Sequence, residues 1–142
     1  MELPDELFIS HSSADHDFVS ELAATLRRHG VPVWFSGTNI LGAQQWHDEI
    51  GAALHRCDWF ALVLSPHAVA SMWVSRELRF ALQQESLNGR IVPLLIEPCD
   101  TARLSWVLSS LQIIDFSRDP SKAYRQLLRI WGLGYQPHPG SG

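Results

Sequence analysis

The sequence predicts an α/β domain in which about five helices flank a mainly parallel sheet of five strands. Its five short apolar runs are continuous rather than alternating, which is typical of strands buried on both faces. Between these runs, apolar residues recur at helical spacing. Strands that alternate with helices are joined by right-handed crossovers and form a parallel sheet. Of the doubly wound strand orders, 2-1-3-4-5 suits five strands best.

The apolar runs define the predicted strands in chain order. They span residues 7–9, 31–35, 59–64, 91–96 and 111–114. In the order 2-1-3-4-5 the strand order reverses between the first and third strands, and ligands of such folds bind at that point. The loops after Ile9 and after Leu64 therefore line the predicted crevice.

Helices are predicted in the connections between these strands and after the last one. Apolar stripes at helical spacing are formed by Phe18, Val19, Leu22, Ala23 and Leu26, by Trp46, Ile50, Ala53, Leu54 and Cys57, and by Val74, Leu78, Ala81 and Leu82. Ser12 and Ser13 can cap the first helix, and Gly30 follows its last periodic residues. Residues 98–110 predict a short or irregular helix, and residues 121–133 predict a closing helix.

Length and composition indicate one folded domain. The 142 residues are 46% hydrophobic and 18% charged, which is the balance of a globular core. Residues 134–142 are rich in glycine and proline and predict a flexible tail, or a linker to a further domain such as a sensor. Residues 1–133 then form the domain itself.

Charge and hydropathy argue against several classes of partner. The net charge is -4 and the Lys and Arg residues are scattered, which disfavours nucleic-acid binding. No apolar stretch approaches the ~20 residues of a membrane span, and the acidic start is not a signal peptide. Cys57 and Cys99 lack CxxC spacing and are interpreted as core residues in a reducing compartment. We therefore expect a cytoplasmic protein without nucleic-acid or membrane partners.

Several familiar motifs are missing from the sequence. It contains neither GxGxxG nor GxxxxGK[ST], which excludes a Rossmann fingerprint or a Walker site. Its seven histidines show no HExxH spacing, and no metal site is predicted. The absence of a G-x-S-x-G elbow argues against a Ser/His/Asp triad.

The start of the third predicted helix carries the strongest candidate for a functional residue. Trp73 and Glu77 stand four residues apart and would be neighbours on one helical face. Glu77 lies one helical step from the apolar stripe, so we expect it half-buried at the rim of the crevice. The alternative is that Glu77 complements the helix N-terminus or pairs with Arg76 or Arg79.

Two loops near the predicted crevice are candidates for ligand contacts. Residues 10–13 are four consecutive polar residues after the first strand, where hydroxyls and backbone N–H groups could hold a phosphate or ribose. An ordinary helix cap is the alternative. Residues 36–42 place an apolar pair between glycines and predict a lid or contact surface, or a loop that folds back onto the domain. The large aromatics Trp34, Phe35, Trp46 and Trp59 are interpreted as core residues.

Together these segments resemble a Toll/interleukin-1 receptor (TIR) domain of the bacterial type. The resemblance runs in order from about residue 6 to residue 133. Its matching blocks are residues 7–15, 31–35, 42–50, 62–66 and 71–78, the last of which contains a W-x-x-x-E motif at Trp73 and Glu77. The resemblance implies a flavodoxin-like fold with a five-stranded parallel sheet.

The resemblance also implies an activity, because many members with this motif are NAD+ glycohydrolases in which the glutamate is catalytic. It points to Glu77 as the catalytic residue, with NAD+ as a substrate and no cofactor. Implied substrate contacts are Ser10, His11, Ser12, Phe35, Trp46 and Trp73. The implied mobile loop, which family members use for self-association, includes Ser36, Gly37, Ile40, Leu41 and Gly42. Two departures are Ser36, where bacterial members often carry an acidic residue, and Val74, where cysteine is common.

Three functional hypotheses follow. The first is an NAD+-consuming effector in bacterial defence or signalling, activated by self-association, which releases nicotinamide and gives ADP-ribose or a cyclic variant. The second is a TIR interaction module that only scaffolds partners. The third, a phosphoryl receiver or flavin-binding domain, is disfavoured because Ser10 and His11 stand where a receiver needs acidic residues.

Overall fold

The computed structural model describes residues 2–36 and 43–137, with side chains from residue 48 onward in the second range. Its centre is a five-stranded parallel sheet in the order β2-β1-β3-β4-β5, which confirms the predicted fold class and strand order. The strands are β1 Leu7–Ser10, β2 Val33–Phe35, β3 Trp59–Leu64, β4 Ile91–Leu95 and β5 Ile114–Asp115.

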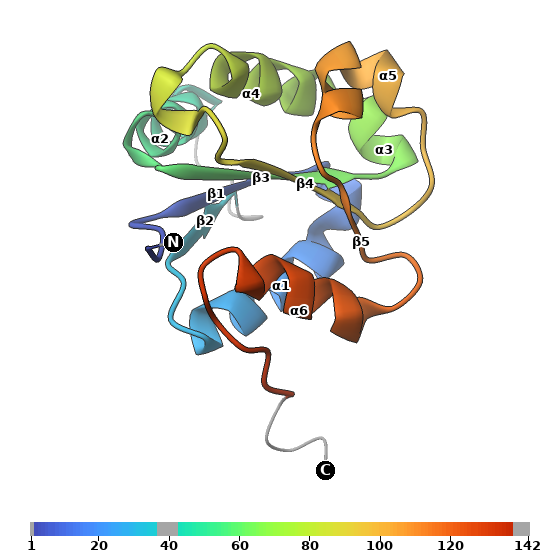
Figure 1. The fold of residues 1–142 in the computed structure, drawn as a ribbon. Coiled ribbons are helices and arrows are strands. Elements are labelled where there is room, and N and C mark those ends of the chain that lie inside the picture. Colours follow the sequence, from blue (N-terminus) through green and yellow to red (C-terminus); the bar gives the residue numbers. More distant parts are fainter. Residues whose placement is uncertain (1, 37–42, 138–142) are drawn as a thin grey trace.

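Helices cover both faces of the sheet. The α-helices are α1 His16–Arg28, α2 Ala43–Arg56, α3 Pro66–Val69, α4 Met72–Leu82, α5 Thr101–Leu104 and α6 Pro120–Arg129, and the 3-10 turns are η1 Ser13–Asp15, η2 Glu85–Leu87 and η3 Trp106–Ser110. Helices α1 and α6 lie against one face, whereas α2, α3, α4 and α5 lie on the other (Figure 1). The irregular helix predicted for residues 98–110 is seen as α5 followed by η3.

The central strand β3 explains why the apolar runs are continuous. Alternate side chains of a strand point to opposite faces of the sheet. Ala61 and Val63 belong to the cluster beneath α1 and α6, whereas Phe60 and Leu62 belong to the cluster beneath α2 and α4. Every residue of β3 is buried, so neither face of the strand has a position for a polar side chain.

The last strand is shorter and starts later than the sequence predicts. The apolar run at 111–114 suggested a strand, but only Ile114 and Asp115 pair with β4. The 3-10 turn η3 continues to Ser110, and Leu111 and Ile113 pack against the cluster under α4. Their hydrophobicity reflects this packing rather than strand pairing.

The first connection also begins differently from the prediction. Ser12 was expected to cap the first long helix, but its hydroxyl accepts a hydrogen bond from Ala14 N at 3.3 Å and caps η1. Asp15 stands at the N-cap of α1, and its side chain makes no cap hydrogen bond. The end of α1 agrees with the prediction, because Gly30 follows it with a φ of 88° that favours glycine.

Part of the segment that was predicted to be a flexible tail packs against the domain. Helix α6 ends at Arg129, short of the predicted residue 133. The Gln136 backbone N–H donates to His29 Nε2 at 2.9 Å, and Arg28 donates to the Gln136 carbonyl at 2.8 Å. The Tyr135 ring stacks on the Tyr124 ring with centroids 5.2 Å apart. Residues 134–137 are therefore held against α1 and α6, and residues 138–142 lie outside the described residues.

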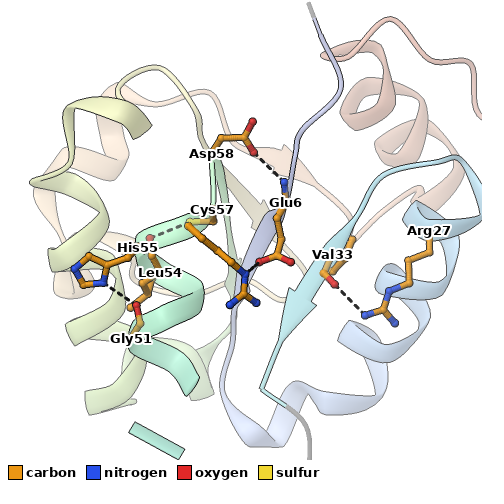
Figure 2. A network of polar contacts seen from close by, with 9 residues as sticks. Glu6, Arg27, Val33, Gly51, Leu54, His55, Cys57 and Asp58 are labelled. Carbon is orange, nitrogen blue, oxygen red and sulfur yellow. Dashed lines mark hydrogen bonds and ion pairs between the residues drawn. The ribbon is translucent and has the colours of Figure 1, made fainter. Parts of the chain in front are cut away.

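A polar cluster ties the start of the chain to the amino ends of the strands (Figure 2). Arg56 Nε donates to Glu6 Oε1 at 2.6 Å, and Asp58 accepts hydrogen bonds from the backbone N–H groups of Asp5 and Glu6 at 3.0 and 3.1 Å. Asp58 Oδ2 also forms an ion pair with Arg90 Nη1 at 3.8 Å. Because these groups are solvated, the cluster contributes little to stability beyond fixing where β1 begins.

None of the described helices has the length and apolar character needed to cross a bilayer.

Candidate functional site at the carboxyl edge of the sheet

The carboxyl ends of β1 and β3 meet the start of α4 at one edge of the sheet. Ser10 is the last residue of β1, and Glu77 lies in the second turn of α4. The Ser10 hydroxyl donates to Glu77 Oε1 at 2.6 Å, which joins residues 67 positions apart in the sequence. Both side chains are buried. Two of the predicted site residues are thus in direct contact at the edge where ligands of parallel α/β sheets bind.

Glu77 is buried rather than half-buried, which corrects the expectation from the sequence. Its side chain is only 7% exposed. Together with Val74, Leu78 and Ala81 it occupies positions i, i+3, i+4 and i+7 of one buried stripe, so it belongs within the apolar face of α4. The spacing was equally compatible with the stripe that ends at Leu82, and the packing of α4 decided that Glu77 is covered while Leu82 is 38% exposed.

Burial controls the protonation of Glu77. Removal from water raises its pKa to about 7, and the hydrogen bond from Ser10 acts in the opposite direction with a smaller effect. The carboxyl group is therefore present in both protonation states near neutral pH. A buried, pKa-shifted carboxyl group at the carboxyl edge of such a sheet is a candidate for a functional group.

The alternative pairing of Glu77 with a neighbouring arginine is not what the structure shows. The Arg76 guanidinium lies over the Trp73 ring, 5.5 Å from its centroid, and Arg79 is exposed. The Trp73 side chain is partly buried, one helical turn before Glu77. The Arg76 guanidinium thus interacts with an aromatic ring rather than with the Glu77 carboxyl group.

His11 places an unpaired polar atom in the same region. The side chain is only 9% exposed, and its Nδ1 has no hydrogen-bond partner among the described residues. Burial lowers the pKa of the His11 ring. An unsatisfied buried ring nitrogen costs about 1–3 kcal/mol, and such a group is where a ligand or water completes the pairing.

The end of β2 brings an aromatic ring to this loop. The Phe35 ring meets the His11 ring edge-on, with centroids 6.0 Å apart, and its centroid lies 6.1 Å from that of the His16 ring. Phe35 is partly buried and packs against the core cluster beneath α1, so it also contributes to the core as its strand suggested. Trp59 is buried as predicted, and Trp34 is partly buried against Phe8.

Several predicted site residues cannot be placed in this arrangement. The backbone of Trp46 lies in α2, but its side chain is outside the described part of the structure. Gly37, Ile40, Leu41 and Gly42 also lie outside the described residues, whereas Ser36 is partly buried at the end of β2.

Asp15 and Ser65 form a second buried contact that sequence reasoning missed. The Ser65 hydroxyl donates to Asp15 Oδ2 at 2.5 Å, and the two residues are 50 positions apart. Neither residue was singled out as a candidate from the sequence. The only sequence signal was their position in the two loops predicted to line the crevice, because nothing local indicates that they touch.

A separate cavity of about 1080 Å³ lies at the opposite edge of the sheet. Its lining includes Trp59 and Ile91, which begin β3 and β4, and residues at the end of α4 and in α6. It does not include Ser10, His11 or Glu77. Among the described side chains, those of residues 2–36 and 48–137, no group of three or more His, Cys, Asp or Glu is arranged to hold a metal ion.

Comparison with known families decides the classification. The family model of the TIR domain matches residues 7–128, which include all five strands. The chain belongs to the TIR domain family. This TIR domain also resembles solved structures at identities that establish the fold alone. It matches the TIR domain of the Toll-related receptor TRR-2 from Hydra magnipapillata with a TM-score of 0.72 and 19% identity, over 88% of this chain and 96% of that one. It matches a prokaryotic SEFIR domain with a TM-score of 0.67 and 18% identity, over 96% and 99% of the two chains.

Curated relatives of this TIR domain come from bacteria. It is 34% identical over 93 residues to the NAD(+) hydrolase PdTIR of Paracoccus denitrificans, covering 64% of this chain and 31% of that protein. It is 34% identical over 85 residues to the 2' cyclic ADP-D-ribose synthase AbTIR of Acinetobacter baumannii, covering 59% and 31%. The alignments thus span about a third of the length of these relatives.

Proposed function

We propose that this TIR domain is an NAD+ glycohydrolase that cleaves the bond between nicotinamide and ribose, with Glu77 as its catalytic residue. The observation that carries the proposal is the buried Glu77 carboxyl group, held by Ser10 at the carboxyl edge of the sheet, with a pKa of about 7. The relatives named as an NAD(+) hydrolase and a 2' cyclic ADP-D-ribose synthase support the substrate.

One carboxylate is sufficient for this chemistry. The nicotinamide nitrogen of NAD+ is cationic at the glycosidic bond, so nicotinamide leaves as a neutral molecule and needs no general acid. As the C1'–N bond breaks, positive charge develops on the ribose, and a nearby carboxylate stabilises it. Water then forms the new C1'–O bond and loses its proton to Glu77 or to solvent. If a hydroxyl of the substrate attacks instead of water, the product is cyclic.

The proposed substrate contacts follow from the groups around Glu77. His11 offers the unpaired Nδ1 to a hydrogen-bonding group of NAD+. Trp73 and Phe35 offer partly buried rings, and an aromatic face attracts the cationic nicotinamide ring or stacks on adenine. Ser10 and Ser12, together with Trp46 of α2, complete the proposed set.

Nicotinamide release from NAD+ by concentrated protein tests the proposal. We expect Glu77→Gln to reduce release by at least about a hundredfold, because the isosteric amide keeps the packing but cannot stabilise positive charge. Glu85→Ala, which changes an exposed glutamate of η2, should retain activity. Undiminished release by Glu77→Gln would remove Glu77 from the catalytic role. No release by the wild type, even when concentrated, would favour an interaction module.

We further propose that activity depends on self-association, with residues 36–42 as part of the contact, and that the domain serves as an effector in bacterial defence or signalling. One of the structural neighbours is the TIR portion of the activated Roq1 resistosome, with a TM-score of 0.64 and 16% identity. The second candidate function, a non-catalytic interaction module, is favoured by one observation. Trp106 and Met72 are 78% and 65% exposed, and a partner protein could cover these large apolar side chains.

A further inference from the structure

Asp15 makes a hydrogen bond that is unusual for a residue at a helix N-cap. An aspartate at an N-cap normally accepts a hydrogen bond from the first turn of its own helix. The Asp15 side chain makes no such bond to α1 and instead accepts from the Ser65 hydroxyl at 2.5 Å. Asp15 is 8% exposed and Ser65 is fully buried. Because burial of a carboxylate is costly unless it is paired, this contact is specific rather than incidental.

The Ser65 hydroxyl is fixed from both sides. It donates to Asp15 and accepts from the Ala68 backbone N–H at 3.1 Å, which caps α3. The donor role leaves its hydrogen with a single direction, toward the Asp15 carboxylate. The contact therefore fixes the start of α3 relative to the loop that follows β1.

Helix α3 leads directly into the helix that carries Glu77. Only Ala70 and Ser71 separate α3 from α4, and the Ser71 hydroxyl accepts from Val74 N at 3.2 Å to cap α4. The segment from Ser10 to Asp15 is thus joined to the segment from Ser65 to Glu77 by a buried hydrogen bond at each of its ends. Two such contacts restrict both the position and the rotation of α4. A single contact would still allow α4 to rotate about it.

We infer that Asp15 is a positioning residue, whose hydrogen bond with Ser65 holds the Glu77 carboxyl group in its buried place against Ser10. This inference rests on the proposed function only for its catalytic consequence. Loss of the contact lets α3 and α4 move away from the loop after β1 and admits water to Glu77. A displacement of about 1 Å at a reacting group lowers a rate by up to about a hundredfold.

The test compares Asp15→Ala and Ser65→Ala with Asp15→Asn, which keeps an oxygen acceptor for Ser65. The first readout is the titration midpoint of the Glu77 side-chain carboxyl carbon, measured by 13C NMR. Burial is the main cause of its high pKa, so both alanine variants should lower the midpoint by at least about one pH unit. Asp15→Asn should stay close to the wild type, and the double alanine variant should equal either single one.

The second readout separates positioning from simple loss of stability. Asp119 caps α6 on the other face of the sheet by accepting from Lys122 N at 3.2 Å, so Asp119→Ala serves as the control. We expect it to lower Tm without moving the Glu77 midpoint. In nicotinamide release, Asp15→Ala should lower kcat about tenfold with KM within about twofold. In Asp15→Asn, which keeps the oxygen acceptor, kcat should be close to the wild-type value.

Two results would overturn the inference. One is a Glu77 midpoint in Asp15→Ala and Ser65→Ala that matches the wild type, with only Tm reduced as in Asp119→Ala. The other is an Asp15→Asn variant that behaves like Asp15→Ala, because the charge and not the hydrogen bond would then matter. If the wild type releases no nicotinamide, the proposed function fails, and the NMR midpoints still decide the positioning role.

Discussion

At the scale of residues, the contact between Ser10 and Glu77 combines two opposing effects on one carboxyl group. Burial favours the protonated form, whereas the hydroxyl donor favours the ionised form. Burial dominates, and the pKa of about 7 leaves the group able to accept or give up a proton at neutral pH. A solvent-exposed glutamate on the same helix would remain ionised at neutral pH and could not give up a proton there.

The raised pKa of Glu77 predicts how stability depends on pH. Between pH 5 and 8 the folded state holds a proton that the unfolded state has released, so the free energy of unfolding falls as pH rises. The loss approaches about 3 kcal/mol above pH 8, from about 1.4 kcal/mol per unit of pKa shift. Glu77→Gln should lack this dependence. Urea unfolding at pH 5 and 8 measures it, and equal pH profiles for the two proteins would contradict the buried placement.

Removal of the Ser10 hydroxyl should raise the pKa of Glu77 further. Ser10→Ala deletes the donor that stabilises the carboxylate, so we expect the NMR midpoint to rise by about one unit above its value near 7. Nicotinamide release at pH 7 should fall about fivefold, as the ionised fraction does, and recover at pH 9. Ser109→Ala, which removes an exposed hydroxyl bonded to the Trp106 carbonyl, is the matched control. A midpoint that stays near 7 in Ser10→Ala would show that Ser10 does not tune Glu77.

At the scale of elements, the termini of helices and strands place the functional groups. Serine side chains cap α3 and α4, so the two short helices begin at defined residues after β3. On the other face, the contacts that hold the segment after α6 include a backbone donor from Gln136 to the imidazole of His29. The His29 Nδ1 contacts the Thr25 carbonyl at 2.7 Å, which makes Nε2 the acceptor for Gln136.

A pair of variants tests whether this segment stabilises the domain. Gln136→Pro removes the backbone N–H that donates to His29, whereas Gln136→Ala keeps it. We expect Gln136→Pro to lower the free energy of unfolding by about 1 kcal/mol and Tm by several degrees, with little change in Gln136→Ala. Thermal unfolding at pH 7.5 measures both. Identical Tm values would mean that residues 134–137 behave as the flexible tail that their composition suggests.

At the scale of the whole molecule, two apolar clusters on opposite faces of the sheet are joined through β3. Leu62 is fully buried beneath the helices α2 and α4. Leu62→Ala should therefore lower the free energy of unfolding by about 2–5 kcal/mol, since the neighbours cannot collapse into the cavity. Leu82→Ala, at a residue that is 38% exposed, should cost about 1 kcal/mol or less. Chemical denaturation measures both, and comparable losses would contradict the described core.

Local patterns predicted the elements more accurately than their contacts. The continuous apolar run at 59–64 has the bounds of β3 because a strand buried on both faces has no polar position. The run at 111–114 misled because Leu111 and Ile113 are apolar for packing reasons outside the strand. Glu77 was placed at the edge of its stripe because it lies one helical step from the residues taken as the apolar face of its helix. Its burial depends on what α4 packs against, which spacing does not contain.

The sequence by itself determined the α/β class, the strand order, and the position of Trp73 and Glu77 at the start of a helix near the crevice. These follow from hydrophobic periodicity and chain connectivity, which are local properties. The tertiary structure alone decided the burial of Glu77, the unpaired Nδ1 of His11, and the contacts from Ser10 to Glu77 and from Ser65 to Asp15. The two contacts join residues 67 and 50 positions apart, and burial and pairing depend on which distant segments the fold brings together.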